Sequence, residues 1–201
     1  HENILKNAKM RQDFTANVSH ELKTPLTAIS GYAELMMNGM VRPENIADFS
    51  GRIYKEANRL GNLVADIIQL SRLDEQQDAV VSMESVELDE LAKDVVNNLR
   101  DHAEKKNISL DYCGIPINIQ GVRHVLYEML YNIADNAVRY TNPGGHIHIY
   151  VGRKGDRPFY RVEDDGIGIP KSEQKRIFER FYRVDKSHSR QTGGTGLGLS
   201  I

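Results

Sequence analysis

Apolar residues recur at alternating intervals of four and three near the start of the chain, and this heptad pattern limits the fold more than any other feature. The first series is Val18, Leu22, Pro25, Ile29, Tyr32 and Met36. After the helix-breaking run MNGMVRPEN, a second series follows at Ile46, Phe49, Ile53, Glu56, Leu60, Leu63, Ile67 and Leu70. Pro43 suits the first turn of a second helix. Because helices joined by a short connection pack antiparallel, residues 1–75 are predicted to form a helical hairpin.

The apolar stripes of this hairpin are wider than a pair of helices needs. Leu26, Ala28 and Leu35 add apolar surface on positions that flank the first heptad series. Two antiparallel helices cannot cover both stripes, so we predict that the hairpin forms a homodimer with the core of a four-helix bundle.

The composition is that of a soluble globular protein. The 201 residues are 40% hydrophobic and 27% charged, with a formal net charge of -2. This charge balance argues against nucleic acid as a partner. No apolar run approaches the roughly 18 residues that span a bilayer, and the first residues lack a signal-peptide core, so we expect a cytoplasmic portion of a longer protein. The single cysteine, Cys113, is expected to be a small core residue.

One histidine occupies an unusual place in the heptad pattern. His20 falls at an outward-facing position, with Glu21 beside it and Thr24 one turn further along the helix. Pro25 cannot donate a hydrogen bond to the carbonyl of Glu21, so we expect the helix to kink or loosen there. Glu56 is a charge at a core position, predicted either to partner the loosened region or to extend to the rim of the bundle.

The second half of the chain alternates helical and strand patterns. A linker is predicted at residues 76–84 and a domain at 85–201. Within that domain, apolar spacing indicates helices over 88–103 and 122–140. Alternating residues indicate strands near 108–113, 117–119, 147–151 and 159–162. We therefore expect an α/β sandwich with one helical face.

Three clusters in this domain could bind a ligand or take part in a reaction, although each also has a plain structural explanation. Asn132 and Asn136 share a helical face, where amide oxygens suit Mg²⁺ but are also ordinary polar surface. The segment EDDGIGIP is a turn with two glycines. The segment GGTGLGLSI is either a flexible tail or a glycine-rich loop that runs into a helix start, an arrangement that attracts phosphate.

Two other site types are not favoured by the residues. The chain has no GKS or GKT segment, so a P-loop lacks its lysine. His146 and His148 share one strand face with no further ligand placed to help them, and we expect a polar sheet face there rather than a metal site.

The segment HELKTPLTAI, preceded by FTANVS, resembles the phosphoacceptor box of bacterial sensor histidine kinases. The resemblance implies that His20 is phosphorylated and that Glu21 acts as the base. It also implies that Thr24 orients water when the protein dephosphorylates its partner.

The later segments NIADNAVRYT, DDGIGIP, IFERFYR and GGTGLGLS, taken in this order, resemble the catalytic ATP-binding domain of the same kinases. This domain has the Bergerat fold, shared with gyrase, Hsp90-type chaperones and MutL-type ATPases. The resemblance implies ATP as substrate, and Asn136 with Asn132 as Mg²⁺ ligands. It implies that Arg139 contacts phosphate, that Tyr140 lines the adenine pocket and that Asp164 accepts from the adenine amino group beside Gly166 and Gly168. In a mobile lid, Phe178 and Phe181 would be anchors, and cations including Arg180 and Arg183 would face the triphosphate. The phosphate end would be shaped by Gly194, Thr195, Gly196, Leu197 and Gly198.

These resemblances imply an ATP-dependent protein-histidine kinase. It would autophosphorylate His20, pass the phosphoryl group to an aspartate of a response regulator receiver domain, and also act as a phosphatase. The parent protein is expected to be membrane-anchored, and the family's domain is expected to continue beyond Ile201. Two rival functions share part of the pattern. A Bergerat-type ATPase clamp would not need His20, and a dimerisation scaffold would not need Asn132, Asn136 and Asp164 together.

Overall fold

The computed structural model describes residues 2–76, 83–184 and 196–200. The chain divides into two compact units, the first formed by residues 1–74 and the second by most of the remaining residues. In the described residues, no helix has both the length and the apolar character needed to cross a membrane.

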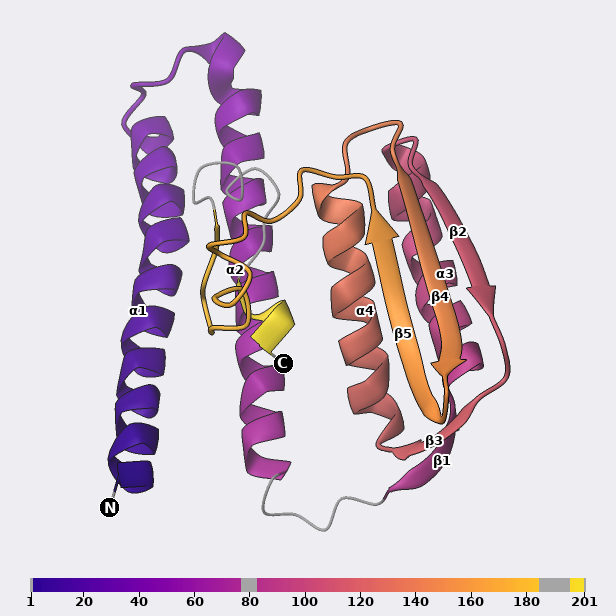
Figure 1. Ribbon diagram of the computed structural model, residues 1–201. Helices are drawn as coiled ribbons and strands as arrows, with labels where there is room; N and C mark the ends of the chain where they lie inside the picture. The colour runs from indigo at the N-terminus through magenta and orange to yellow at the C-terminus, as the bar shows by residue number, and fades with distance from the viewer. Residues whose placement is uncertain (1, 77–82, 185–195, 201) are drawn as a thin grey trace. The chain divides into compact units, whose positions relative to one another are not determined.

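The first unit is the predicted helical hairpin. Helix α1 (Glu2–Met37) runs into a turn, a short 3-10 helix η1 (Pro43–Asn45) and helix α2 (Ile46–Gln76) (Figure 1). The turn begins with Gly39, whose φ of 65° is the left-handed conformation that glycine adopts without steric cost. Its N–H bonds the carbonyl of Met36 and the next N–H bonds that of Leu35, the paired pattern of a Schellman cap.

The two helices of the hairpin meet through aromatic residues near this turn. The Tyr32 and Phe49 rings lie edge to face with centroids 5.6 Å apart. The Arg52 guanidinium lies 5.9 Å from the centroid of each ring and pairs with Asp48 at 2.9 Å. These contacts join the heptad series that the sequence predicts for the two helices.

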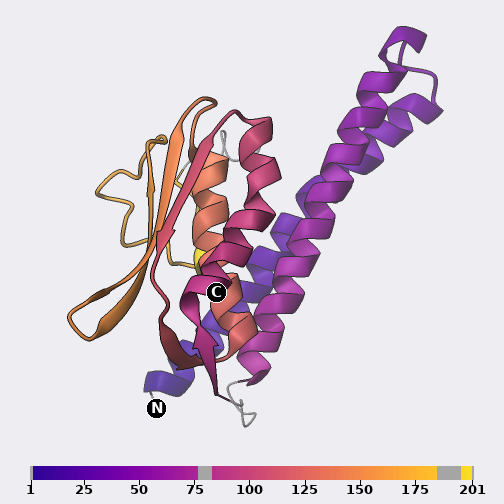
Figure 2. The same ribbon diagram turned by 90° about the vertical axis from the view of Figure 1, so that its right-hand side faces the viewer.

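The second unit is an α/β structure with its helices on one side of a sheet. Its elements are β1 (Glu84–Glu87), α3 (Leu88–Lys105), β2 (Ser109–Gly114), β3 (Asn118–Gly121), α4 (Arg123–Tyr140), β4 (His146–Lys154), β5 (Arg157–Asp164) and a 3-10 turn η2 (Gly198–Ser200). In the larger sheet the order is β2-β4-β5, with β2 parallel and β5 antiparallel to β4. Strands β1 and β3 form a separate antiparallel pair. Figure 2 shows α3 and α4 on the same face of the three-stranded sheet, as predicted.

The core of this unit lies between the helices and that sheet. Its buried side chains come from the apolar stripe of α3, from α4 and from alternate residues of β4: Leu91, Val95, Leu99, Leu130, Ala134, Ile147, Ile149 and Val151. Alternation in β4 leaves His146 and His148 on the opposite, exposed face. The long helices α3 and α4 therefore have fixed positions against the sheet.

One prediction about this unit is wrong, and one strand was not predicted. Cys113 is exposed, because the inward positions of β2 are those of Leu110 and Tyr112, and the next residue faces the other way. Strand β1 begins inside the segment predicted to be linker, and the sequence analysis missed it. The segment ESVE becomes a strand by pairing with β3, a tertiary contact that a four-residue pattern does not reveal.

Candidate functional site

His20 is exposed on α1, as its heptad position predicts. The Thr24 hydroxyl donates to the carbonyl of His20 at 3.2 Å, which places the two residues one above the other on the helix. Glu21 is half-buried and turned toward α2. The imidazole is therefore presented to solvent with a carboxylate on the adjoining residue.

Helix α1 continues through Pro25, where the sequence suggested a kink or loosening. Pro25 is fully buried and has no N–H, so the carbonyl of Glu21 has no donor four residues ahead. Burial of the ring within the hairpin compensates for the missing hydrogen bond. The helical turn that holds His20 and Glu21 therefore lacks one hydrogen bond but keeps its helical form.

A charged cluster surrounds Glu21 inside the hairpin. Arg59 Nη2 lies 3.6 Å from Glu21 Oε2, and Arg59 Nη1 lies 3.7 Å from Glu56 Oε2. The Arg59 side chain is 16% exposed, and Glu56 Oε2 is buried with no hydrogen-bond partner among the described residues. The unusual core glutamate is thus explained, because it shares one guanidinium with the carboxylate that follows His20.

The second candidate site lies on α4. Asn132 and Asn136 occur one turn apart, and the Asn132 side-chain nitrogen is buried without a hydrogen-bond partner among the described residues. A Cβ built on Gly198 would lie 3.5 Å from both Cγ and Oδ1 of Asn132, so the glycine loop packs against this amide. Arg139 donates from Nε to Asp135 on the same helix at 2.6 Å. An amide without a partner beside a glycine backbone suits a polar ligand.

The loop after β5 packs against the last turn of α4. The Asp164 carboxylate accepts from the N–H of Gly166 at 3.0 Å, and the N–H of Ile167 donates to the carbonyl of Tyr140 at 3.3 Å. A Cβ on Gly166 would lie 2.6 Å from that same carbonyl, closer than atoms can approach. Gly168 has a φ of 67°, which side chains rarely adopt. A side chain is therefore excluded at Gly166 by a steric clash and disfavoured at Gly168 by the backbone conformation.

The histidines of β4 pair with carboxylates, which the sequence analysis did not foresee. His146 contacts Asp165 twice, from its backbone N–H at 2.8 Å and from its ring Nδ1 at 3.0 Å. These bonds, the backbone one first, lower the pKa of Asp165. His148 Nδ1 lies 3.5 Å from Asp111. Among the described residues, no group of three histidine, cysteine or acidic residues is arranged to hold a metal.

The aromatic segment and the glycine loop meet in the described part of the C-terminal region. Phe181 has a φ of 63°, and its N–H donates to the carbonyl of Gly196 at 2.8 Å. Leu197 is fully buried and Leu199 is half-buried. Phe178, expected to be an anchor, is instead 62% exposed.

Of the remaining predicted site residues, some lie within the described residues and others outside them. Arg180 is exposed and Arg183 half-buried, one on each side of Phe181. Gly194, Thr195 and most of the predicted lid lie outside the described residues. Asp165, which pairs with His146, was not singled out from the sequence. Its signal was its position between Asp164 and Gly166 in EDDGIGIP.

Comparison with known proteins agrees with the two units. Residues 10–76 match the His Kinase A (phospho-acceptor) domain, and residues 121–201 match the histidine kinase-, DNA gyrase B- and HSP90-like ATPase. The sensor-like histidine kinase SenX3 of Mycolicibacterium smegmatis is 36% identical over 192 residues, covering 95% of this chain and 50% of SenX3. The chain therefore spans about half the length of the curated relatives it matches.

Two solved structures of histidine kinases have a similar fold. The full-length histidine kinase ShkA in complex with AMPPNP has a TM-score of 0.58 and 27% identity, covering 94% of this chain and 39% of ShkA. Histidine kinase ThkA in complex with the response regulator protein TrrA has a TM-score of 0.75 over 89% of this chain and 52% of that chain. Its 23% identity shows likeness of fold.

The matched regions are a phospho-acceptor domain followed by a histidine kinase-like ATPase domain. The chain belongs to the family of two-component sensor histidine kinases.

Proposed function

We propose that this protein is an ATP-dependent protein-histidine kinase that phosphorylates itself on His20. The observation that carries the proposal is the exposed imidazole on α1, followed by a carboxylate, in a chain whose α4 places a buried amide without a partner against a glycine loop. The similarity to SenX3, and to ShkA solved with AMPPNP, supports the same activity.

In this function the neutral His20 ring attacks the γ-phosphorus of ATP. A nitrogen–phosphorus bond forms, the bond to the leaving ADP oxygen breaks, and the other ring nitrogen gives its proton to the Glu21 carboxylate. A histidine is a suitable nucleophile because it is largely neutral near pH 7. Phosphoryl transfer requires mainly positioning and charge neutralisation, so the residues that orient the nucleotide contribute most.

The nucleotide is proposed to bind along α4 and the two glycine segments. Asp164 would accept from the adenine amino group, Tyr140 would line the base pocket, and the loop from Gly196 to Gly198 would face the phosphates. In this structure Arg139 pairs with Asp135, and its contact with phosphate would replace or share that pair.

The side-chain oxygens of Asn132 and Asn136 would hold Mg²⁺. Amide oxygens are hard ligands that suit this ion. The atom without a hydrogen-bond partner among the described residues is the Asn132 side-chain nitrogen, a donor, which suits a polar ligand beside the ion. When bound, the ion supplies charge neutralisation at the phosphates. In this proposal Asn132 also keeps the glycine loop close to α4, because its amide packs on Gly198.

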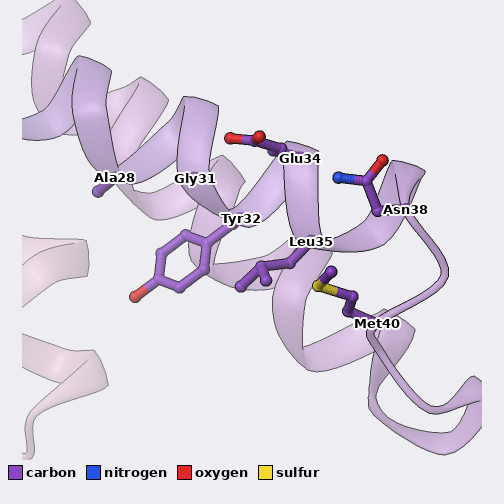
Figure 3. A pocket seen from close by; sticks show the side chains of 7 residues that line it. All are labelled: Ala28, Gly31, Tyr32, Glu34, Leu35, Asn38 and Met40. Carbon is purple, nitrogen blue, oxygen red and sulfur yellow. The ribbon is translucent and has the colours of Figure 1, made fainter.

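The partners proposed for the hairpin are a second copy of itself and a response regulator. The groove in Figure 3, with a volume of about 480 Å³, lies on the end of α1 near the turn and is lined partly by Tyr32, Leu35 and Met40, which project to the same side. These apolar side chains support the homodimer. The ThkA complex with TrrA supports a receiver domain as acceptor, and Thr24, one turn from His20, would orient water for dephosphorylation.

Labelling with γ-labelled Mg-ATP tests this function. The expected product is an acid-labile, base-stable label that is absent in His20→Gln and retained in His102→Gln, a control at an exposed histidine of α3. Phosphate release without label, unchanged in His20→Gln, would contradict the proposal and favour an ATPase clamp. Absence of nucleotide binding would favour a dimerisation scaffold instead.

A further inference from the structure

The corner of the second unit where α3 ends is held by one lysine. Lys106 directly follows α3, and its ammonium donates to the carbonyls of Val138, Arg139 and Thr141 at 2.7, 3.0 and 2.9 Å. A lysine ammonium has three protons, so each finds one acceptor. All three acceptors lie at the C-terminal end of α4, 32 to 35 residues further along the chain.

These carbonyls need an external donor. The last carbonyls of a helix have no N–H four residues ahead, and the helix dipole gives that end a partial negative charge. The Lys106 ammonium supplies donors and positive charge together. Burial lowers the pKa of Lys106, so the site has an electrostatic cost that the three hydrogen bonds offset.

Backbone contacts strengthen the same corner. The N–H of Gly144 bonds the carbonyl of Lys106 at 3.3 Å, and the N–H of Ser109 bonds that of Gly145 at 2.9 Å. The end of α3 and the loop after α4 therefore form one connected corner, with the Lys106 side chain at its centre.

The carbonyl that Lys106 leaves out of this turn is that of Tyr140. It accepts from the N–H of Ile167 and lies against the Cα of Gly166, in the loop that carries Asp164. The turn of α4 that Lys106 fixes is thus the surface on which the Asp164 loop rests. Movement of that turn would move Tyr140 and Asp164 together.

We propose that Lys106 is a positioning residue for nucleotide binding, which holds the last turn of α4 so that Tyr140 and the Asp164 loop keep their arrangement. This inference rests on the proposed function, since it assigns the nucleotide to that loop. Lys106 does not act on the phosphates, because its three protons are all used on α4 carbonyls. Its loss therefore affects binding of the nucleotide rather than the chemical step.

The test is the ATP dependence of His20 phosphorylation in Lys106→Met, which keeps the length of the side chain and removes its donors. We expect KM for ATP to rise about tenfold with kcat changed less than about twofold. Lys106→Arg, whose planar guanidinium matches the three converging carbonyls poorly, should give a smaller rise.

Lys93→Met is the matched control. Lys93 lies on α3 and is also bonded, but to Asp89 of the same helix at 2.6 Å. Its variant should leave KM for ATP unchanged. Equal rises in KM for the two methionine variants would show only a general loss of stability and would overturn the inference.

Hydrogen exchange supplies a second readout that does not depend on turnover. In Lys106→Met the Ile167 amide should exchange faster, while the amide of Ile149 in the central strand stays as slow as in the parent. Unchanged exchange at Ile167 with unchanged KM would also overturn the inference. If the parent protein itself does not bind Mg-ATP, the proposed function is wrong. That result is measured on the parent alone and is independent of the two lysine variants. Should Lys106→Met not fold, Lys106→Gln undergoes the same comparison.

Discussion

At the scale of single residues, the cluster around Arg59 shows how a charge enters the core of a heptad hairpin. Glu21 and Glu56 come from different helices, and each lies within 3.7 Å of the same guanidinium. Without the cation, two partly buried carboxylates would face each other. Arg59 offsets the repulsion between these carboxylates, so each helix can carry one at that level of the hairpin.

This geometry predicts the effect of replacing Arg59. Arg59→Met should destabilise the hairpin by roughly 1 kcal/mol, because the carboxylates lose their counter-ion while staying partly screened by solvent. Adding Glu56→Gln should recover most of that loss, since one of the two negative charges is then gone. Thermal unfolding of the two single variants and the double variant measures the coupling. Strictly additive losses would show that the three side chains do not act as a unit.

At the scale of elements, patterns within one segment predicted the helices and strands well. Contacts between distant segments could not be predicted from such local patterns. The face of α4 follows from the spacing of Asn132 and Asn136 alone. Strand β1 depends on its pairing with β3, and Lys106 depends on carbonyls of another helix. Cys113 was assigned by residue type, whereas the alternation of β2 already pointed outward. The packing of Asn132 on Gly198 joins segments whose separation hides it from local patterns.

The start of α3 is tied to β2 through a buried carboxylate, and this tie should depend on pH. Asp89 accepts from Lys93 Nζ at 2.6 Å and from the Tyr112 hydroxyl at 2.5 Å. These bonds, that from Lys93 first, lower the pKa of Asp89 in the folded state below the ordinary value of 3.8. A carboxyl group with a lowered folded pKa contributes stability above its unfolded pKa, and the contribution is lost as pH falls through the folded pKa.

We therefore expect Asp89→Asn to unfold at a lower temperature than the parent at pH 7, with a loss of about 1–3 kcal/mol. The difference should shrink as pH falls below 3.8, because Asp89 then binds a proton in the unfolded parent, whereas the folded parent binds it only at the lower folded pKa. Thermal unfolding followed from pH 7 to pH 2.5 or so checks both parts. Asp101→Asn, at an exposed carboxylate of the same helix, should show no such pH-dependent difference. A gap that stays constant with pH would rule out the linkage.

At the scale of the whole molecule, the hairpin leaves too much apolar surface exposed to be complete alone. Among its described side chains, the fully buried apolar residues are Leu63 and Pro25, whereas many large apolar residues remain exposed: Leu26, Leu35, Met37, Met40, Ile46, Tyr54, Val64 and Ile68. Exposed apolar surface of this extent marks an interface. A second copy would present the same stripes, and an isologous four-helix bundle would cover them without any other protein.

A charge placed within this surface should separate the two copies. Leu35 is 39% exposed and lines the groove beside the turn, so Leu35→Glu would bury a carboxylate in the dimer but leave it solvated in the monomer. We expect a predominantly dimeric parent and a shift of this variant to monomer in light scattering coupled to size exclusion. Thr27→Glu introduces the same charge at an outward heptad position of the same helix and should remain dimeric. A monomeric parent would contradict the homodimer, and a dimer in both variants would place the interface elsewhere. His20 lies on the same helix and on its outward side, so the imidazole would stay exposed when Leu35→Glu separates the two copies. Any fall in His20 labelling in this variant would therefore report how far each ATP domain depends on the partner copy.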